Sequence, residues 1–62
     1  MPKPAALELL LKAYRDEIAW LIDRAKEYEE NGQPLVAGEY IHRAHNLEAM
    51  IQAYERLDAI GS

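Results

Sequence analysis

The stretch Asn31-Gly32-Gln33-Pro34 interrupts an otherwise regular hydrophobic pattern near the centre of the chain. Asparagine or glycine can take the left-handed backbone conformation that closes a helix, and proline suits the first turn of a new helix. Because the chain has only 62 residues, it forms one domain, residues 1–62, with two arms of similar length. We therefore expect helix 1 at about residues 4–30, a turn at 31–34 and helix 2 at about residues 35–60.

Both arms carry hydrophobic residues at alternating spacings of three and four, which is the heptad pattern of helices that pack along one seam. The seam consists of Leu7, Leu11, Tyr14, Ile18, Leu21, Ala25 and Tyr28 in the first arm and of Ala37, Tyr40, Ala44, Leu47, Ile51, Tyr54 and Asp58 in the second. Residues that face each other have numbers that sum to 65, as for Leu21 and Ala44. The pattern predicts an all-α fold, an antiparallel two-helix hairpin of the coiled-coil type.

Composition excludes several classes of function. The chain has no cysteine, so disulfides and thiolate metal sites are excluded, and a cytoplasmic location is the default expectation. The net charge is −4 and the basic residues are scattered, which disfavours binding to nucleic acid. No apolar run is long enough to span a membrane. Without a nucleophile–base constellation or a glycine-rich phosphate loop, we expect no enzymatic activity and no cofactor.

The two flanks of the seam differ in polarity. One flank carries a second apolar stripe with the only tryptophan, interrupted by Glu17, Arg24, Arg43 and Asn46. The residues that we expect at an interface on this flank are Leu10, Ala13, Glu17, Trp20, Met50, Ala53, Leu57 and Ile60. The opposite flank is mostly charged, and there we expect an exposed ion pair between Arg15 and Glu48. An apolar stripe on a chain too small to bury much surface indicates protein contact, so we expect a homodimer that forms a four-helix bundle. Glu17 would fix the register of such a bundle if it were buried.

A weaker signal concerns metal binding. Glu39 and His42 have the Glu-x-x-His spacing that places two ligands on one helical face, and His45 lies one turn from His42. The predicted register points Glu39 and His42 away from the seam, and solvated surface histidines are far commoner than zinc ligands. These three residues are therefore kept only as minor candidates, and no metal site is expected.

Two resemblances to known families were considered. The predicted architecture resembles the plasmid copy-number regulator, a four-helix-bundle dimer that grips paired RNA loops, although a basic face is missing here. The segment 44–54 is similar to helix 2 of the small hairpin aspartyl-phosphate phosphatases of sporulating bacteria. Ala44 and Glu48 stand where that family's Ser-Gln-Glu-Leu-Asp signature has its serine and aspartate, so the resemblance implies no phosphatase activity. Neither resemblance assigns the chain to a family.

The sequence thus favours a small non-enzymatic protein–protein interaction module. It is expected to associate with itself through the apolar stripe and to act on another protein as a regulator, adaptor or scaffold. The alternatives are a plasmid-type nucleic-acid-binding regulator and a small hairpin phosphatase or metal-binding bundle.

Overall fold

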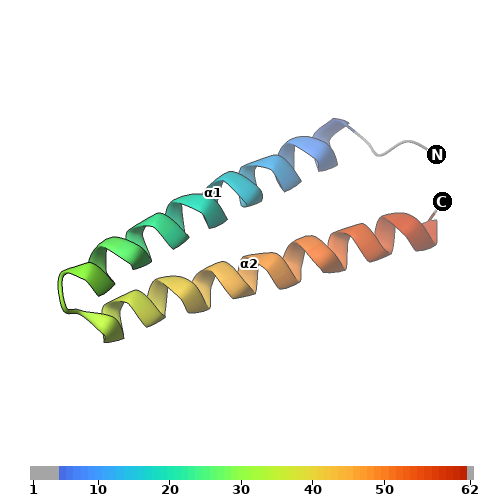
Figure 1. Cartoon of the computed structure of the whole chain (residues 1–62). Helices are drawn as coiled ribbons and strands as arrows, with labels where there is room; N and C mark the ends of the chain where they lie inside the picture. The colour runs from blue at the N-terminus through green and yellow to red at the C-terminus, as the bar shows by residue number, and fades with distance from the viewer. Residues whose placement is uncertain (1–4, 62) are drawn as a thin grey trace.

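The chain folds into two antiparallel helices that lie side by side and are joined by a short turn (Figure 1). The computed structural model describes residues 5–61, with side chains for residues 5–60. Helix α1 spans Ala5–Glu30 and helix α2 spans Pro34–Gly61, so the predicted all-helical hairpin is confirmed. Pro34, which we placed in the turn, is the first residue of α2, and α2 continues to Gly61. The expected start of helix 1 at residue 4 lies outside the described residues.

The turn has the hydrogen-bond pattern of a Schellman motif, the commonest way to end a helix with a glycine. The amide of Gly32 donates to the carbonyl of Glu29 over 3.1 Å, and the amide of Gln33 donates to the carbonyl of Tyr28 over 2.8 Å. Gly32 has φ +78°, so it supplies the left-handed residue. The carbonyl of Gln33 then accepts from the amide of Ala37, which starts α2 with Pro34 in its first turn.

The core is the predicted seam. Every seam residue is buried or half-buried, whereas outside the seam only Val36 and Glu55 among the described side chains are half-buried and the others are exposed. The buried residues are Leu11, Leu21, Ala25, Ala37, Ala44 and Ile51. The heptad spacing therefore identifies the packed face of both helices.

Two stacked tyrosine pairs cross the seam. The rings of Tyr14 and Tyr54 have centroids 6.4 Å apart, and those of Tyr28 and Tyr40 have centroids 5.4 Å apart. In both pairs the residue numbers sum to 68, whereas the predicted sum for facing residues is 65. Tyr14, for example, stacks on Tyr54, which is the next seam residue after the predicted partner Ile51. Because both pairs give the same sum, the two helices keep one register over two heptads.

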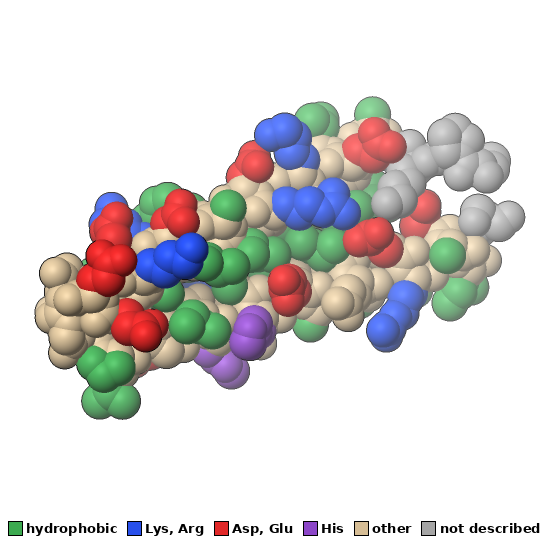
Figure 2. All heavy atoms as spheres, in the orientation of Figure 1, with side chains coloured by type: hydrophobic (Ala, Val, Ile, Leu, Met, Phe, Trp, Pro, Cys, Tyr) green, Lys and Arg blue, Asp and Glu red, His purple; other side chains and the backbone are tan. Residues whose placement is uncertain are grey.

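The hairpin is long and thin, with extents of 47 × 17 × 10 Å. Its radius of gyration is 14.5 Å, whereas a compact domain of this length would have about 11 Å. Side chains of both helices fill the junction between them, and charged side chains surround it on the face shown in Figure 2. Neither described helix combines the length and the apolar character that crossing a membrane requires.

The seam can be tested with neighbouring substitutions. Leu21→Ala should lower the free energy of unfolding by about 2–4 kcal/mol, because Leu21 is fully buried and alanine would leave a cavity. Ile22→Ala is the matched control, since Ile22 is 39% exposed and should cost clearly less. Chemical denaturation followed by circular dichroism, at one fixed protein concentration, measures both. Equal losses would contradict the assignment of the seam.

The turn can be tested by replacing Gly32, which needs a left-handed backbone, and Gly38, which lies inside a helix. Gly32→Ala should destabilise the fold by about 1–2 kcal/mol, because it forces alanine into the left-handed region. Gly38 lies within α2, and a Cβ added there would meet nothing within 4 Å. Gly38→Ala should therefore stabilise the fold by about 0.5–1 kcal/mol. The melting temperatures should shift in opposite directions; a shift in the same direction would contradict this description of the turn.

Candidate protein-interaction surface

The apolar stripe lies along one side of the seam on both helices, because its residues occupy matching heptad positions in α1 and α2. All its predicted residues have exposed side chains: Leu10, Ala13, Glu17, Trp20, Met50, Ala53, Leu57 and Ile60. The larger ones leave much of their surface in water, with Met50 40%, Leu57 66% and Ile60 82% exposed. The hairpin itself therefore does not cover the stripe.

Part of the Trp20 ring packs against side chains of its own hairpin. Its ring meets the ring of Tyr40 edge to face, with centroids 6.2 Å apart. The guanidinium carbon of Arg24 lies 5.5 Å from the centroid of the indole, a cation–π distance. Arg24 also donates to Glu27 over 2.8 Å, which holds its side chain in place. The indole is thus oriented while 49% of its surface stays exposed.

The pKa of Tyr40 is raised above its ordinary value, mainly by the side-chain hydrogen bond and the charge interaction with Tyr28. Desolvation adds to the increase, whereas the positive charges of Arg24 and Arg43 oppose it. Folding therefore favours the protonated phenol. The stability that this provides is complete below the ordinary pKa and is lost as the pH rises through the raised pKa.

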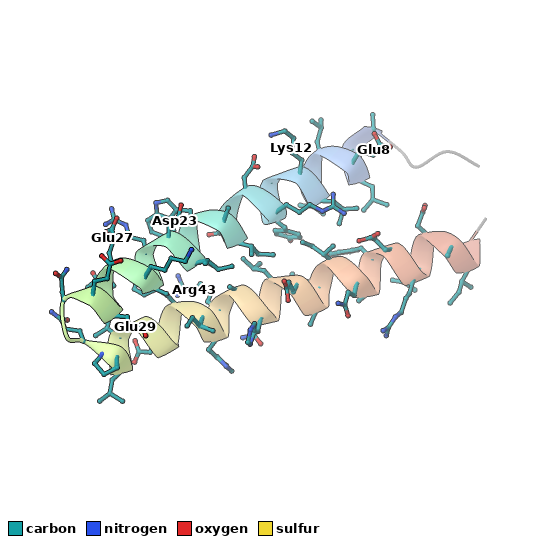
Figure 3. All side chains as sticks on the ribbon, viewed as in Figure 1. Glu8, Lys12, Asp23, Glu27, Glu29 and Arg43 are labelled. Carbon is teal, nitrogen blue, oxygen red and sulfur yellow. The ribbon has the colours of Figure 1, made fainter. Side chains whose placement is uncertain are left out.

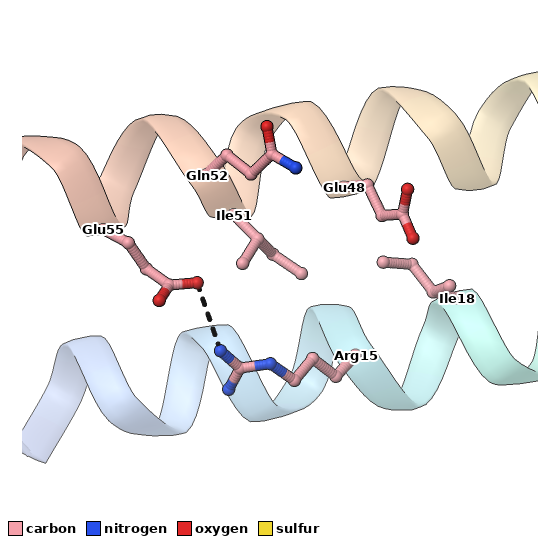
Figure 4. Close-up of a pocket in the computed structure, with 6 residues that line it drawn as sticks. All are labelled: Arg15, Ile18, Glu48, Ile51, Gln52 and Glu55. Atoms are coloured by element: carbon pink, nitrogen blue, oxygen red, sulfur yellow. Dashed lines mark hydrogen bonds and ion pairs between the residues drawn. The ribbon is translucent and has the colours of Figure 1, made fainter.

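The opposite flank is polar, and its ion pair differs from the expected one. Arg15 donates to Glu55 over 3.3 Å, not to Glu48 (Figure 4). Side chains of both helices lean toward their own N-termini, so contacts across the seam fall at residue sums above 65, as they do in the tyrosine stacks and in this pair. Both glutamates help to line a hollow of 330 Å³, together with Ile18, Ile51, Gln52 and Arg15. The pair is exposed and contributes under about 1 kcal/mol.

Exposed charges continue along α1. Near its start, Lys12 donates to Asp16 over 2.8 Å, and this hydrogen bond raises the pKa of Lys12. Near its end, Glu27 and Glu29 lie beside the turn, with Arg43 on the facing part of α2 (Figure 3). The last turn of α1 has no basic residue. The helix dipole disfavours carboxylates there, so these charges do not stabilise the helix end.

The minor metal candidates are surface residues of α2. Glu39, His42 and His45 all have exposed side chains. Within residues 5–61, no three histidine, aspartate or glutamate side chains are grouped closely enough to hold a metal ion. Glu17 would fix the register of a four-helix bundle if it were buried, and in the single hairpin its side chain is exposed.

Two exposed leucines were not singled out from the sequence. Leu9 is 69% exposed and Leu35 is 88% exposed. Both occupy the heptad position farthest from the seam, so the signal was present in the spacing. Single exposed leucines are common on protein surfaces and carry no functional assignment.

Comparison of the chain with protein-family models, with curated proteins and with solved structures finds no significant match.

The environment of Tyr40 can be tested by removing one hydroxyl. Tyr28→Phe should keep the ring stack and lower the pKa of Tyr40 toward its ordinary value, because the Tyr28 hydroxyl is the main cause of the increase. Tyr54→Phe removes a hydroxyl from the other stack and should leave the pKa of Tyr40 unchanged. Titration of ring-labelled tyrosine by NMR measures both variants. An unchanged Tyr40 pKa in Tyr28→Phe would contradict the assignment.

Proposed function

We propose that this chain is a small, non-enzymatic protein–protein interaction module. In this proposal two hairpins pack their apolar stripes together as a homodimeric four-helix bundle, and the bundle acts on other proteins as a regulator, adaptor or scaffold in the cytoplasm. The observation that carries the proposal is the exposure of the whole stripe, including Trp20, Met50 and Leu57.

The solvent-accessible area of the hairpin is large enough for a second hairpin to pack on it. The chain exposes 4809 Å², whereas a compact monomer of this mass exposes about 4,100 Å². A compact particle of twice the mass exposes about 6,800 Å², so a dimer of that kind would bury about 2,800 Å² in total. Interfaces of obligate homodimers bury roughly 2,000–5,000 Å². A second copy is therefore an occupant of suitable size for the uncovered surface.

The composition of the stripe is also that of an interface. Tryptophan and methionine are enriched in interface cores, and buried tryptophans are frequent anchors of binding energy. Trp20 is held by Tyr40 and Arg24, so little side-chain entropy remains to be lost when a partner covers it. The opposite flank offers only Ile22 and Ile41 as large hydrophobic residues among charged neighbours.

A matched pair of substitutions on α2 tests the proposal. Met50 is 40% exposed on the stripe and Ile41 is 38% exposed on the opposite flank, so replacing either by glutamate introduces a charge at similar exposure. Sedimentation should show a dimer for the parent chain and for Ile41→Glu. Met50→Glu should weaken the dimer at least about tenfold, because a carboxylate would be desolvated at the interface. A parent chain that sediments at 7.1 kDa up to high micromolar concentration would refute the proposal.

A further inference from the structure

The exposed flank that carries the apolar stripe changes character along the length of the hairpin. Because the chain reverses at Gly32 and Gln33, residues n and 65 − n lie at about the same distance from the turn. The half near the chain ends, called the terminal half, is apolar except for Glu17 at its inner edge, and its apolar residues are Leu10, Ala13, Met50, Ala53, Leu57 and Ile60. The half near the turn, called the turn half, contains mainly polar residues beside Trp20 and Val36: Arg24, Glu27, Glu39, Arg43 and Asn46.

This difference between the two halves favours some arrangements of the dimer over others. If two hairpins overlap fully with their turns at opposite ends, the terminal half of each covers the turn half of the other. Leu10 then lies opposite Arg24, and Leu57 lies opposite Glu39. Apolar side chains would desolvate charged groups without pairing them, which is costly. If the turns lie at the same end, apolar surface meets apolar surface along the terminal half except at Glu17.

In the same arrangement, Arg24 lies between two carboxylates of the turn half, Glu27 of its own chain and the partner's Glu39. With both turns at one end, each α1 packs beside the partner's α2, and all neighbouring helices are antiparallel. Arg24 and Glu39 differ by only two residues in their distance from the turn, about 3 Å along the axis. Glu39 forms no ion pair within the described part of its own chain. Arg24 of one protomer therefore faces an available carboxylate on the other, and the symmetry axis repeats the pair.

We infer that two copies of this chain pack side by side with their turns at the same end, joined by the terminal halves and by reciprocal Arg24–Glu39 pairs. This inference rests on the proposed self-association and specifies its geometry. The second copy is the chosen occupant because the uncovered area suits a homodimer and because the apolar terminal half of one copy matches that of the other.

Distance measurements between two identical labels test the geometry. The chain has no cysteine, so Gln33→Cys at the turn and Arg56→Cys near the end of α2 each give one labelling site per protomer. Both residues are exposed, so spin labels should not disturb the seam. With helix axes 8–10 Å apart, both label pairs should lie within roughly 25 Å in the proposed dimer.

The other outcomes are distinct. Full overlap with opposite turns would place the position-33 labels more than about 40 Å apart, because the hairpin is 47 Å long. Overlap of the terminal halves alone, with opposite turns, would give a short distance at position 56 and a long one at position 33. Either result overturns the inferred geometry but leaves the homodimer. Absence of intermolecular coupling, together with sedimentation as a monomer, would instead refute the proposed function.

A charge-swap cycle provides an independent test of the Arg24–Glu39 pair. Arg24→Glu and Glu39→Arg should each weaken the dimer several-fold, and the double variant should recover most of that loss. The cycle cancels the effect of losing the Arg24–Glu27 pair inside one chain, since that loss occurs with and without the second substitution. Purely multiplicative effects on the dimer dissociation constant would overturn the reciprocal pairing.

Discussion

The hydrogen bond from the amide of Gln33 to the carbonyl of Tyr28, 2.8 Å long, fixes where the chain reverses. It requires the left-handed backbone at Gly32, and it makes Gln33 both the end of one helix and the cap of the next. A turn this short leaves little freedom in how the two helices face each other. The seam register, the tyrosine stacks and the position of every flanking residue follow from this point of reversal.

A hairpin with one seam buries few side chains completely, and none of the buried residues is aromatic. Tyr14, Tyr28, Tyr40 and Tyr54 lie on the seam but remain half-buried, since only one helix covers each of them. Packing a second layer on the stripe would cover surface that the first layer cannot reach. The same thinness that limits the stability of the single hairpin therefore gives it a large surface for association.

Most of the fold could be predicted from the sequence because the heptad spacing and the Asn-Gly-Gln-Pro interruption are local signals. The spacing identified which residues are buried, but it did not identify individual side-chain partners. Arg15 pairs with Glu55 and not with Glu48, because side chains that lean toward their N-termini shift the contacts between antiparallel helices beyond the register that the spacing predicts. The contacts of Trp20 with Tyr40 and Arg24 depend on side-chain rotamers, which spacing alone does not specify. The residues of the stripe are exposed in the single hairpin, and the dimer inferred from them remains a proposal.

The indole at position 20 also gives the protein its own optical reporter. It is the only tryptophan in the chain, and one face of it already lies near a guanidinium while about half of its area meets solvent. Emission from this ring shifts to shorter wavelength when water leaves it, and small quenchers then lose access. The single tryptophan thus lies where a change in the surroundings of the turn half becomes visible without any added dye.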